Sequence, residues 1–389
     1  MSESFDRQSA APGFSGDPTR SLTPSGAFYY SPEIFELERR RIFHRHWVYL
    51  CHESQAPKTG DYLVGDIVGQ SVVAIRGRDG ALRVFFNVCQ HRAHQILKGS
   101  GNVQAMIRCP YHSWTYDLDG RLRHAPECEA VKDFDKGKIG LQAVRGESVG
   151  GFVFVNLDPS APSLDEAAPS FRRRLLAMAP EAARLKHART QEFEIKANWK
   201  VVAENFLENY HSIYSGLAHA QLSTIIDQST YGWEIDGKVV QFVGRGGAPD
   251  TLPYRGNDKR TLTGRDEGFL IVYLWPSVAF VMLPGADVVL VFLMTPSGPE
   301  TTFEPLLYFT PDGSLDQGTN AAVDWFNVVL GPEDVEICES VQRGLHSLGY
   351  RAGRLMVDPA CQAIWSEHFL HHFNSLNIGA LEKAETPAR

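Results

Sequence analysis

The chain lacks several features that would each point to a class of function. Its 389 residues include 38 Lys and Arg against 46 Asp and Glu, so it has no basic excess suited to nucleic acid. No apolar run reaches 18 residues, and the N-terminus lacks a basic segment followed by an apolar one. We therefore expect neither a membrane span nor a signal peptide. No G-x-G-x-x-G stands between a strand and a helix, so we expect no nicotinamide or flavin site in this chain.

Cysteine is also scarce. Six cysteines lie at positions 51, 89, 109, 128, 338 and 361, with no spacing that suggests disulfide pairs. Unpaired thiols are typical of a reducing compartment, so we expect a cytoplasmic protein. The length suits two domains, and 43% hydrophobic with 11% aromatic residues can bury a sizeable core.

Two short segments each combine one cysteine with one histidine. They are Cys89-Gln90-His91 and Cys109-Pro110-Tyr111-His112, and 17 residues separate them. Two thiolates and two imidazoles on two loops are the ligands of a Rieske [2Fe–2S] cluster, a one-electron carrier of fairly high potential. A structural zinc site uses the same residue types, but its pairs usually have two to four spacer residues, and the first pair has one. The spacing favours the cluster over zinc.

The surrounding residues carry a family resemblance. Asn87 to Arg92 (NVCQHR) and Arg108 to Trp114 (RCPYHSW) resemble the Rieske domain of ring-hydroxylating, non-haem iron oxygenases, in their large (alpha) subunits. Ala93 and Ser113 stand where that family usually has glycine. We expect strain at both positions if the loops need positive φ, which glycine tolerates best.

A second segment extends the resemblance. Residues 198–211 (NWKVVAENFLENYH) are similar to the family segment that leads into a mononuclear Fe(II) site. The resemblance implies His211 and His219 as iron ligands, with Asp334 as the carboxylate, and Glu333 and Glu336 as competitors for that role. Two histidines and one carboxylate leave iron positions open for dioxygen.

The two iron histidines are unusually far apart in the sequence. Seven residues lie between His211 and His219, where the family usually has four. Eight residues of straight helix span about 12 Å, too far for two ligands of one metal. We therefore expect the helix to break between them, with Ser215-Gly216 as the candidate breaker. The resemblance also implies that Glu208 joins an iron histidine to a cluster histidine of a neighbouring subunit, by accepting a hydrogen bond from each.

The pattern of elements predicts an α+β protein. We expect a mobile tail over 1–24, a helix within 25–47, an all-β Rieske domain over 48–157, a linker over 158–170, and a catalytic domain over 171–389. The last should be helix-grip-like, because apolar strands at 269–275, 277–283, 287–294 and 302–310 follow one another with short turns and suit an antiparallel sheet.

The resemblance implies the terminal oxygenase of a multicomponent system. A separate NAD(P)H-dependent reductase, with or without a ferredoxin, would supply electrons, and the subunits would form a trimer or an assembly of trimers. The alternatives are a Rieske electron carrier without oxygenase activity and a zinc-organised binding protein. Aromatic side chains available to line a substrate pocket are Tyr231, Trp233, Phe242, Phe269, Tyr273, Trp275 and Phe280.

Two substrate classes stay open. An aromatic acid would need an arginine, for which Arg245 and Arg255 are candidates. A quaternary ammonium compound would need an aromatic box and no arginine. Residues 341–347 and the glutamate at position 208 are similar to family members that act on choline, betaine and carnitine. Both mono- and dioxygenation remain open, and hydroxylation of an N-methyl group would end in demethylation.

Overall fold

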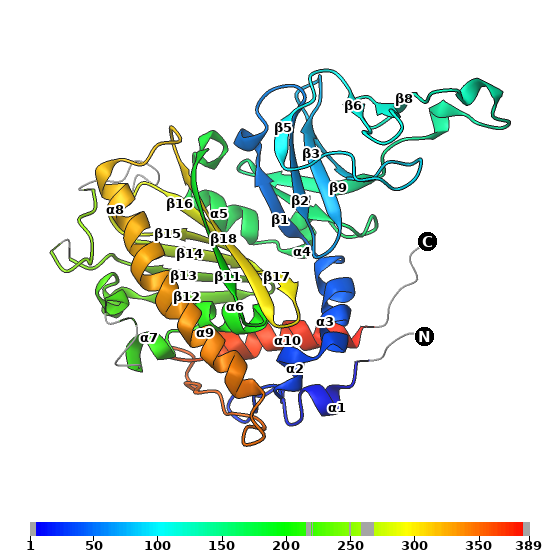
Figure 1. The fold of residues 1–389 in the computed structure, drawn as a ribbon. Coiled ribbons are helices and arrows are strands. Elements are labelled where there is room, and N and C mark those ends of the chain that lie inside the picture. The colour runs from blue at the N-terminus through cyan, green and yellow to red at the C-terminus, as the bar shows by residue number, and fades with distance from the viewer. Residues whose placement is uncertain (1–4, 215–218, 220, 249, 258–267, 384–389) are drawn as a thin grey trace. The chain divides into compact units, whose positions relative to one another are not determined.

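The computed structural model describes residues 5–214, 219, 221–248, 250–257 and 268–383. The chain divides into two compact units. The smaller unit comprises residues 43–163 and 182–184, and the larger unit comprises residues 1–42, 164–181 and 185–389. Figure 1 shows each unit as a ribbon coloured along the chain.

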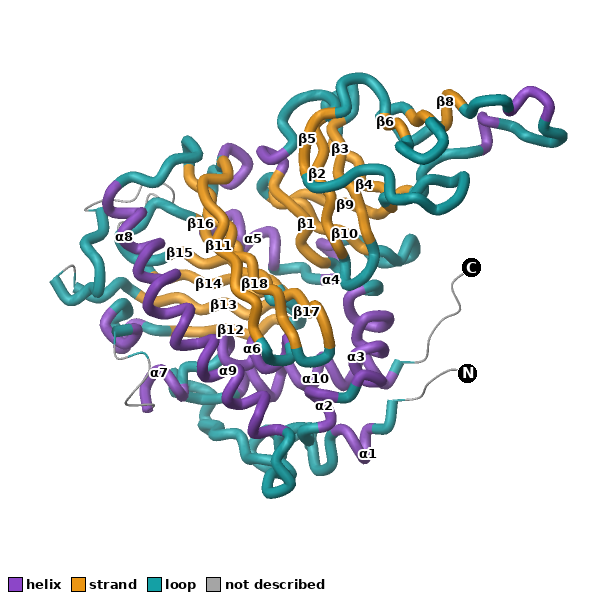
Figure 2. The backbone as a smooth tube through the Cα atoms, in the orientation of Figure 1, coloured by secondary structure: helices purple, strands orange, loops and turns teal. Residues whose placement is uncertain are grey.

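The smaller unit is built from β-strands. Its main antiparallel sheet has the strand order β1-β10-β9-β4-β3-β2-β5, and β6, β7 and β8 form a second, small sheet. Much of the chain between β5 and β9 is loop (Figure 2). The bounds are β1 Val48–His52, β2 Asp61–Asp66, β3 Ser71–Arg76, β4 Leu82–Phe86, β5 Ser100–Asn102, β6 Ile107–Arg108, β7 Thr115–Tyr116, β8 Leu122–His124, β9 Ala143–Val149 and β10 Phe152–Asn156.

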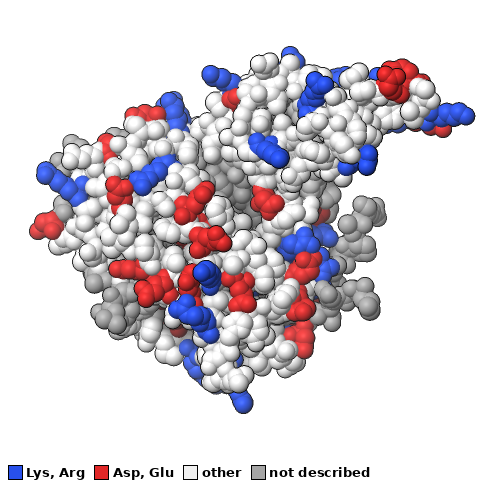
Figure 3. Space-filling model, in the orientation of Figure 1, with Lys and Arg blue, Asp and Glu red and all other residues white. Residues whose placement is uncertain are grey.

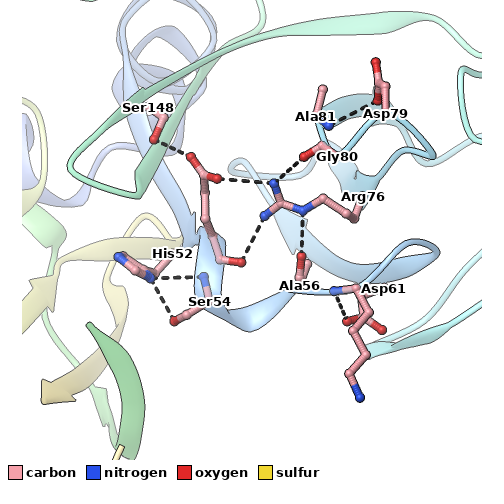
Figure 4. A network of polar contacts seen from close by, with 11 residues as sticks. His52, Ser54, Ala56, Asp61, Arg76, Asp79, Gly80, Ala81 and Ser148 are labelled. Atoms are coloured by element: carbon pink, nitrogen blue, oxygen red, sulfur yellow. Dashed lines mark hydrogen bonds and ion pairs between the residues drawn. The ribbon is translucent and has the colours of Figure 1, made fainter. Parts of the chain in front are cut away.

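A partly buried arginine fastens this sheet to the turn that follows β1. The Arg76 guanidinium donates to the carbonyl oxygens of Glu53, Ala56 and Gly80 at 2.8–3.1 Å, and it contacts the Glu53 carboxylate at 3.2 Å. The Ser148 hydroxyl donates to the same carboxylate at 2.7 Å. Figure 4 shows Arg76 at the centre of this network. Arg76 lies in β3 and Ser148 lies in β9, so the network joins these two strands to the turn after β1.

The larger unit is an antiparallel sheet with helices. The described strands follow the order β11-β18-β16-β15-β14-β13-β12, with β17 paired to β18. This confirms the predicted antiparallel sheet. The strands are β11 Lys186–Ile195, β12 Gly232–Asp236, β13 Val239–Gly244, β14 Phe269–Leu274, β15 Val278–Met282, β16 Val289–Leu293, β17 Thr295–Gly298 and β18 Thr301–Thr310.

The helices of the larger unit cover parts of this sheet. Helix α6 contacts α9, α10 and β18, and α9 also contacts β11. Acidic and basic side chains are interspersed on the face of this unit seen in Figure 3. None of the helices in the described ranges is both long and apolar enough to cross a membrane. The bounds are α1 Arg7–Ala10, α2 Ala27–Tyr30, α3 Pro32–Glu38, α4 Leu164–Ala167, α5 Phe171–Met178, α6 Trp199–Leu207, α7 Tyr210–Tyr214, α8 Gln317–Trp325, α9 Gly331–Leu345 and α10 His368–Glu382.

The N-terminal segment differs from the prediction. The expectation of a mobile tail over 1–24 is wrong for residues 5–24, which are described. Asp6 caps helix α1 by accepting from two backbone N–H groups. Ala10 and Phe14 are buried, and the Phe14 ring stacks on His371 at 5.0 Å. Composition alone misses these two apolar anchors, which hold a segment rich in Ser, Gly and Pro.

Two helical predictions also need correction in their bounds. Within the predicted helical region 25–47, Ser31 caps α3, which ends at Glu38, and a π-helical turn, Arg39–Phe43, follows it. The expected linker over 158–170 contains helix α4. Helix α5 then begins the predicted catalytic region at Phe171.

Candidate active site

The two Cys–His segments form loops with the same backbone pattern. In the first, the Cys89 N–H donates to the His94 carbonyl at 2.9 Å and the Ala93 N–H donates to the Cys89 carbonyl at 3.1 Å. The Cys109 loop repeats both bonds, from Cys109 to Trp114 and from Ser113 to Cys109, at 2.8 and 3.1 Å. We call Cys89–Ala93 and Cys109–Ser113 the cluster loops.

Both cluster loops turn through a residue with positive φ. Ala93 has φ +55° and Ser113 has φ +60°. These are the two positions where the sequence has alanine and serine in place of the usual glycine, so the expected strain is present. A side chain in the left-handed region is unfavourable, and the paired hydrogen bonds of each loop hold it there.

The four candidate ligands differ in burial according to residue type. Cys89 and Cys109 are 3% and 1% exposed and lie in the apolar core of the smaller unit. The rings of His91 and His112 lie nearer solvent, with centroids 4.6 Å apart, and His91 stacks on Trp114 at 4.8 Å. Desolvation and the neighbouring His91 lower the pKa of His112, which favours the neutral ligand form. Two thiols inside and two imidazoles outside fit a cluster with one sulfur-bound and one nitrogen-bound iron.

Tyr116 supports the inner side of this site, and no sequence signal singled it out. Its side chain is fully buried, and its hydroxyl lies 3.2 Å from the Cys89 sulfur. The same oxygen accepts the Gln90 N–H at 3.0 Å. Because the Tyr116 oxygen acts as acceptor toward Gln90, its own O–H can donate to the Cys89 sulfur. Hydrogen bonds to cluster sulfurs are one means by which a protein sets the reduction potential.

The second site begins where helix α6 ends. Asn198 caps α6 by accepting the Lys200 N–H, and Glu208 then adopts an extended conformation with φ −122° and ψ +153°. Helix α7 starts at Tyr210 and carries His211. Glu208 holds this histidine, since it accepts the His211 N–H at 3.0 Å and contacts the ring Nδ1.

His219 reaches the same place by a different route. Helix α7 ends at Tyr214, and His219 has φ +60° and is 1% exposed. Because a residue with φ +60° is not helical, the helix that carries His211 does not continue through His219, as predicted. The proposed breaker, Ser215-Gly216, lies outside the described residues.

Asp334 in the first turn of α9 completes the group. One nitrogen or oxygen from each of His211, His219 and Asp334 lies within 4.8 Å of the others. Asp334 Oδ1 is 2.9 Å from His219 Nε2 and 4.0 Å from His211 Nε2. We call these three residues the triad. Of the competitors, Glu333 faces Nδ1 of His219 at 3.0 Å, and Glu336 is exposed.

The triad suits a divalent metal. Neither ring nitrogen of His219, although buried, makes a hydrogen bond of ordinary geometry to a described residue. Burial lowers the pKa of His219, but the carboxylates of Asp334 and Glu333 outweigh it and leave the pKa above its usual value. Two imidazoles and one carboxylate on one side of a metal match the donor set of non-haem Fe(II).

A mainly apolar cavity adjoins the triad. Of the predicted aromatic residues, Tyr231, Phe242 and Phe269 line the cavity. Three further aromatic residues that the sequence did not indicate also line it: Phe206, Phe292 and Phe326. Trp233, Tyr273, Trp275 and Phe280 are not among the described lining residues, nor are Arg245 and Arg255. The polar part of the wall is supplied by Asn205, Glu208, Asn209, His211, Ser212 and Asp334.

Buried charges anchor helix α6 beneath this cavity. Lys200 and Glu38 form a fully buried ion pair, and the Lys200 ammonium lies 4.6 Å from the Phe28 ring centroid. One turn later, Glu204 accepts from Tyr29 and Asn374, each at 2.8 Å. Burial raises the pKa of Glu204 to about 7.

Comparison with protein families gives two matches. Residues 46–135 match the Rieske [2Fe-2S] domain, and residues 182–376 match the catalytic domain of the ring hydroxylating alpha subunit.

Curated relatives cover nearly the whole chain. The carnitine monooxygenase oxygenase subunit of Escherichia coli K12 is 36% identical over 93% of this chain and 95% of its own length. The glycine betaine monooxygenase oxygenase subunit of Chromohalobacter salexigens is 28% identical over 84% of this chain and 80% of its own length.

Solved structures agree. A quaternary ammonium Rieske monooxygenase studied for carnitine oxidation has a TM-score of 0.84 and 32% identity, over 98% of this chain and all of its own. Naphthalene 1,2-dioxygenase from Rhodococcus shares the fold, with a TM-score of 0.78 at 22% identity over 94% of this chain and 95% of its own.

Proposed function

Since the chain belongs to the Rieske-type, ring-hydroxylating non-haem iron oxygenases, we propose that it is the oxygenase component of a system that monooxygenates a quaternary ammonium compound. A [2Fe–2S] cluster and a mononuclear iron are the cofactors of this family, and a separate reductase supplies the electrons. The match to the catalytic domain contradicts both a bare electron carrier and a zinc-organised binding protein.

The observation that carries the substrate class is the composition of the cavity wall. Six aromatic rings line the cavity, and no lysine or arginine is found among its described lining residues. Aromatic faces attract a quaternary ammonium group, and the carboxylates at the polar end add favourable charge. An aromatic acid would bring only negative charge to a wall that contains Glu208 and Asp334, whereas a quaternary ammonium compound brings a cation that these carboxylates and the rings attract. The curated relatives that act on carnitine and glycine betaine support the same class.

The proposed ligands divide between the two sites. Cys89, His91, Cys109 and His112 would hold the cluster, and His211, His219 and Asp334 would hold the iron. When bound, the cluster supplies single electrons and the iron supplies open positions for dioxygen. The apolar wall orients the substrate and excludes water from the reacting end of the cavity.

Glu208 is proposed as the link between the two sites in a trimer. It already contacts Nδ1 of His211 and is part of the cavity wall. A carboxylate in this position has lone pairs left for a cluster histidine of a neighbouring subunit. Exposed arginines in and beside the cluster loops, Arg92 and Arg108, are opposite in charge to Glu208 and Asp334, which favours such a contact.

Oxygen uptake tests the proposed substrate class. The purified protein, a surrogate reductase and NADH are supplied with carnitine, choline or glycine betaine, and in parallel with benzoate as an aromatic acid. Substrate-dependent uptake, coupled to an oxidised product, is expected with at least one of the methylated amines. Coupled uptake with the aromatic acid alone would contradict the proposal.

A further inference from the structure

Each histidine of the triad faces a carboxylate that reaches both its main-chain N–H and its ring Nδ1. For His211 this carboxylate is Glu208, as described above. For His219 it is Glu333, which accepts the His219 N–H at 2.9 Å and lies 3.0 Å from Nδ1 through the same oxygen, Oε2. The same two contacts therefore occur twice, on two histidines that enter the site from different local structures.

We propose that Glu333 is the positioning residue of His219, an inference that rests on the proposed iron site. An imidazole can offer Nε2 to a metal only when its other nitrogen carries the proton, and an acceptor at Nδ1 selects that tautomer. The Glu333 carboxylate, whose Oε2 lies 3.0 Å from Nδ1, is the group placed to act as this acceptor. By also binding the main-chain N–H, it holds His219 in a left-handed backbone conformation that side chains rarely adopt.

Glu333 and Asp334 are neighbours in the first turn of α9, and their positions explain how this turn contacts both nitrogens of the His219 ring. Consecutive helix residues point about 100° apart. Asp334 therefore reaches Nε2 at 2.9 Å while Glu333 reaches Nδ1. Glu336 is exposed and has no ion pair with a described residue, so it does not share this role.

His211 and His219 belong to different local structures, which explains why a second carboxylate is needed to position His219. His211 lies in helix α7 and is held by Glu208 from its own segment. His219 has a left-handed backbone conformation and is not part of α7, so α7 does not orient it. The partner of His219 comes instead from α9, 114 residues further along the chain.

Metal binding tests this role separately from turnover. The mononuclear iron is removed by mild chelation with the cluster left in place, and Fe(II) is titrated back into the wild type, Glu333→Gln and the matched control Glu336→Gln. We expect Glu333→Gln to bind Fe(II) about 10- to 100-fold more weakly, as is usual when the partner of a metal-bound histidine is lost. Glu336→Gln should bind as the wild type does.

Co(II) substitution gives a spectroscopic readout of the same site. The visible absorption of bound Co(II) should change in Glu333→Gln and stay as in wild type in Glu336→Gln. If Glu333→Gln does not fold, Glu333→Asp replaces it, and it should also bind Fe(II) more weakly because its carboxylate is one methylene shorter.

Three outcomes are distinguishable. Weaker binding and an altered Co(II) spectrum confined to the Glu333 variants support the inference. Wild-type affinity and spectrum in a folded Glu333 variant overturn it and leave the proposed function standing. If the wild type itself takes up no third metal beside the cluster, the proposed function fails, and the inference fails with it.

Discussion

Replacing Tyr116 with phenylalanine is expected to lower the reduction potential of the cluster. The Tyr116 hydroxyl lies 3.2 Å from the Cys89 sulfur and is fully buried, so no water competes for this contact. Reduction adds negative charge to the cluster and its thiolates. A hydrogen bond to sulfur is therefore stronger in the reduced form and stabilises it.

The size of the shift follows from the strength of one hydrogen bond. If the bond contributes about 1 kcal/mol more in the reduced form, the potential should fall by about 40 mV, because a tenfold change in a one-electron equilibrium is about 59 mV. Phenylalanine keeps the ring in the core, but it leaves the Gln90 N–H without its acceptor.

A redox titration followed by electron paramagnetic resonance measures this shift. Tyr62→Phe is a matched control, because Tyr62 packs against the same core but its hydroxyl donates to the Lys98 carbonyl at 3.4 Å, not to sulfur. The reasoning is refuted if folded Tyr116→Phe keeps the wild-type potential, or if Tyr62→Phe shifts it equally.

Three further predictions concern other parts of the chain. Ala93→Gly should stabilise the protein by about 0.5–1 kcal/mol in thermal unfolding, because glycine tolerates φ +55°; Ala81→Gly, at an exposed alanine without positive φ, should not stabilise. Glu208→Gln should keep both metals yet slow cluster oxidation and product formation in rapid-mixing experiments, and wild-type turnover would remove Glu208 from the mechanism. The free energy of unfolding should fall as pH rises, because the Glu204 carboxyl has a pKa of about 7 in the folded state but about 4.5 in the unfolded state. Between these two values the unfolded chain loses its proton first and becomes relatively more stable. Denaturant unfolding between pH 5 and 8 should show this loss in wild type and a smaller one in Glu204→Gln; equal losses would contradict the assignment.

The cluster loops were the part of the site most open to prediction. Their candidate ligands are close together in the sequence, so spacing alone indicated the chemistry. The departures at Ala93 and Ser113 also pointed to positions that do have positive φ. Tyr116 was not predicted, because its contact with Cys89 depends on how strand β7 packs behind the loop.

The sequence predicted that His211, His219 and Asp334 would lie together, as they do, but it did not predict the side chains that support them. Helix geometry required a break before His219, and His219 does have a non-helical backbone conformation. The partnership of Glu333 with His219 joins residues 114 apart, and no local pattern encodes such a distance. The sequence therefore presented Glu333 only as a rival of Asp334.

The cavity wall shows why strand residues are hard to assign. Val281 and Leu283 line the cavity, whereas Phe280, one residue away, points to the opposite side and lies 5.8 Å from the ring of Phe171. Side chains alternate along a strand, and the face that meets the cavity depends on the whole sheet. Aromatic character alone could not separate these residues.

A lone iron, held by the triad, is proposed to lie in the same chain as the cluster. Iron analysis of the purified protein, combined with paramagnetic resonance after reduction and exposure to nitric oxide, tests it most directly. The account predicts three iron atoms per chain and a nitrosyl signal that His211→Ala abolishes while the cluster signal persists. Two iron atoms per chain and no nitrosyl signal, with the triad intact and the site given Fe(II), would contradict it.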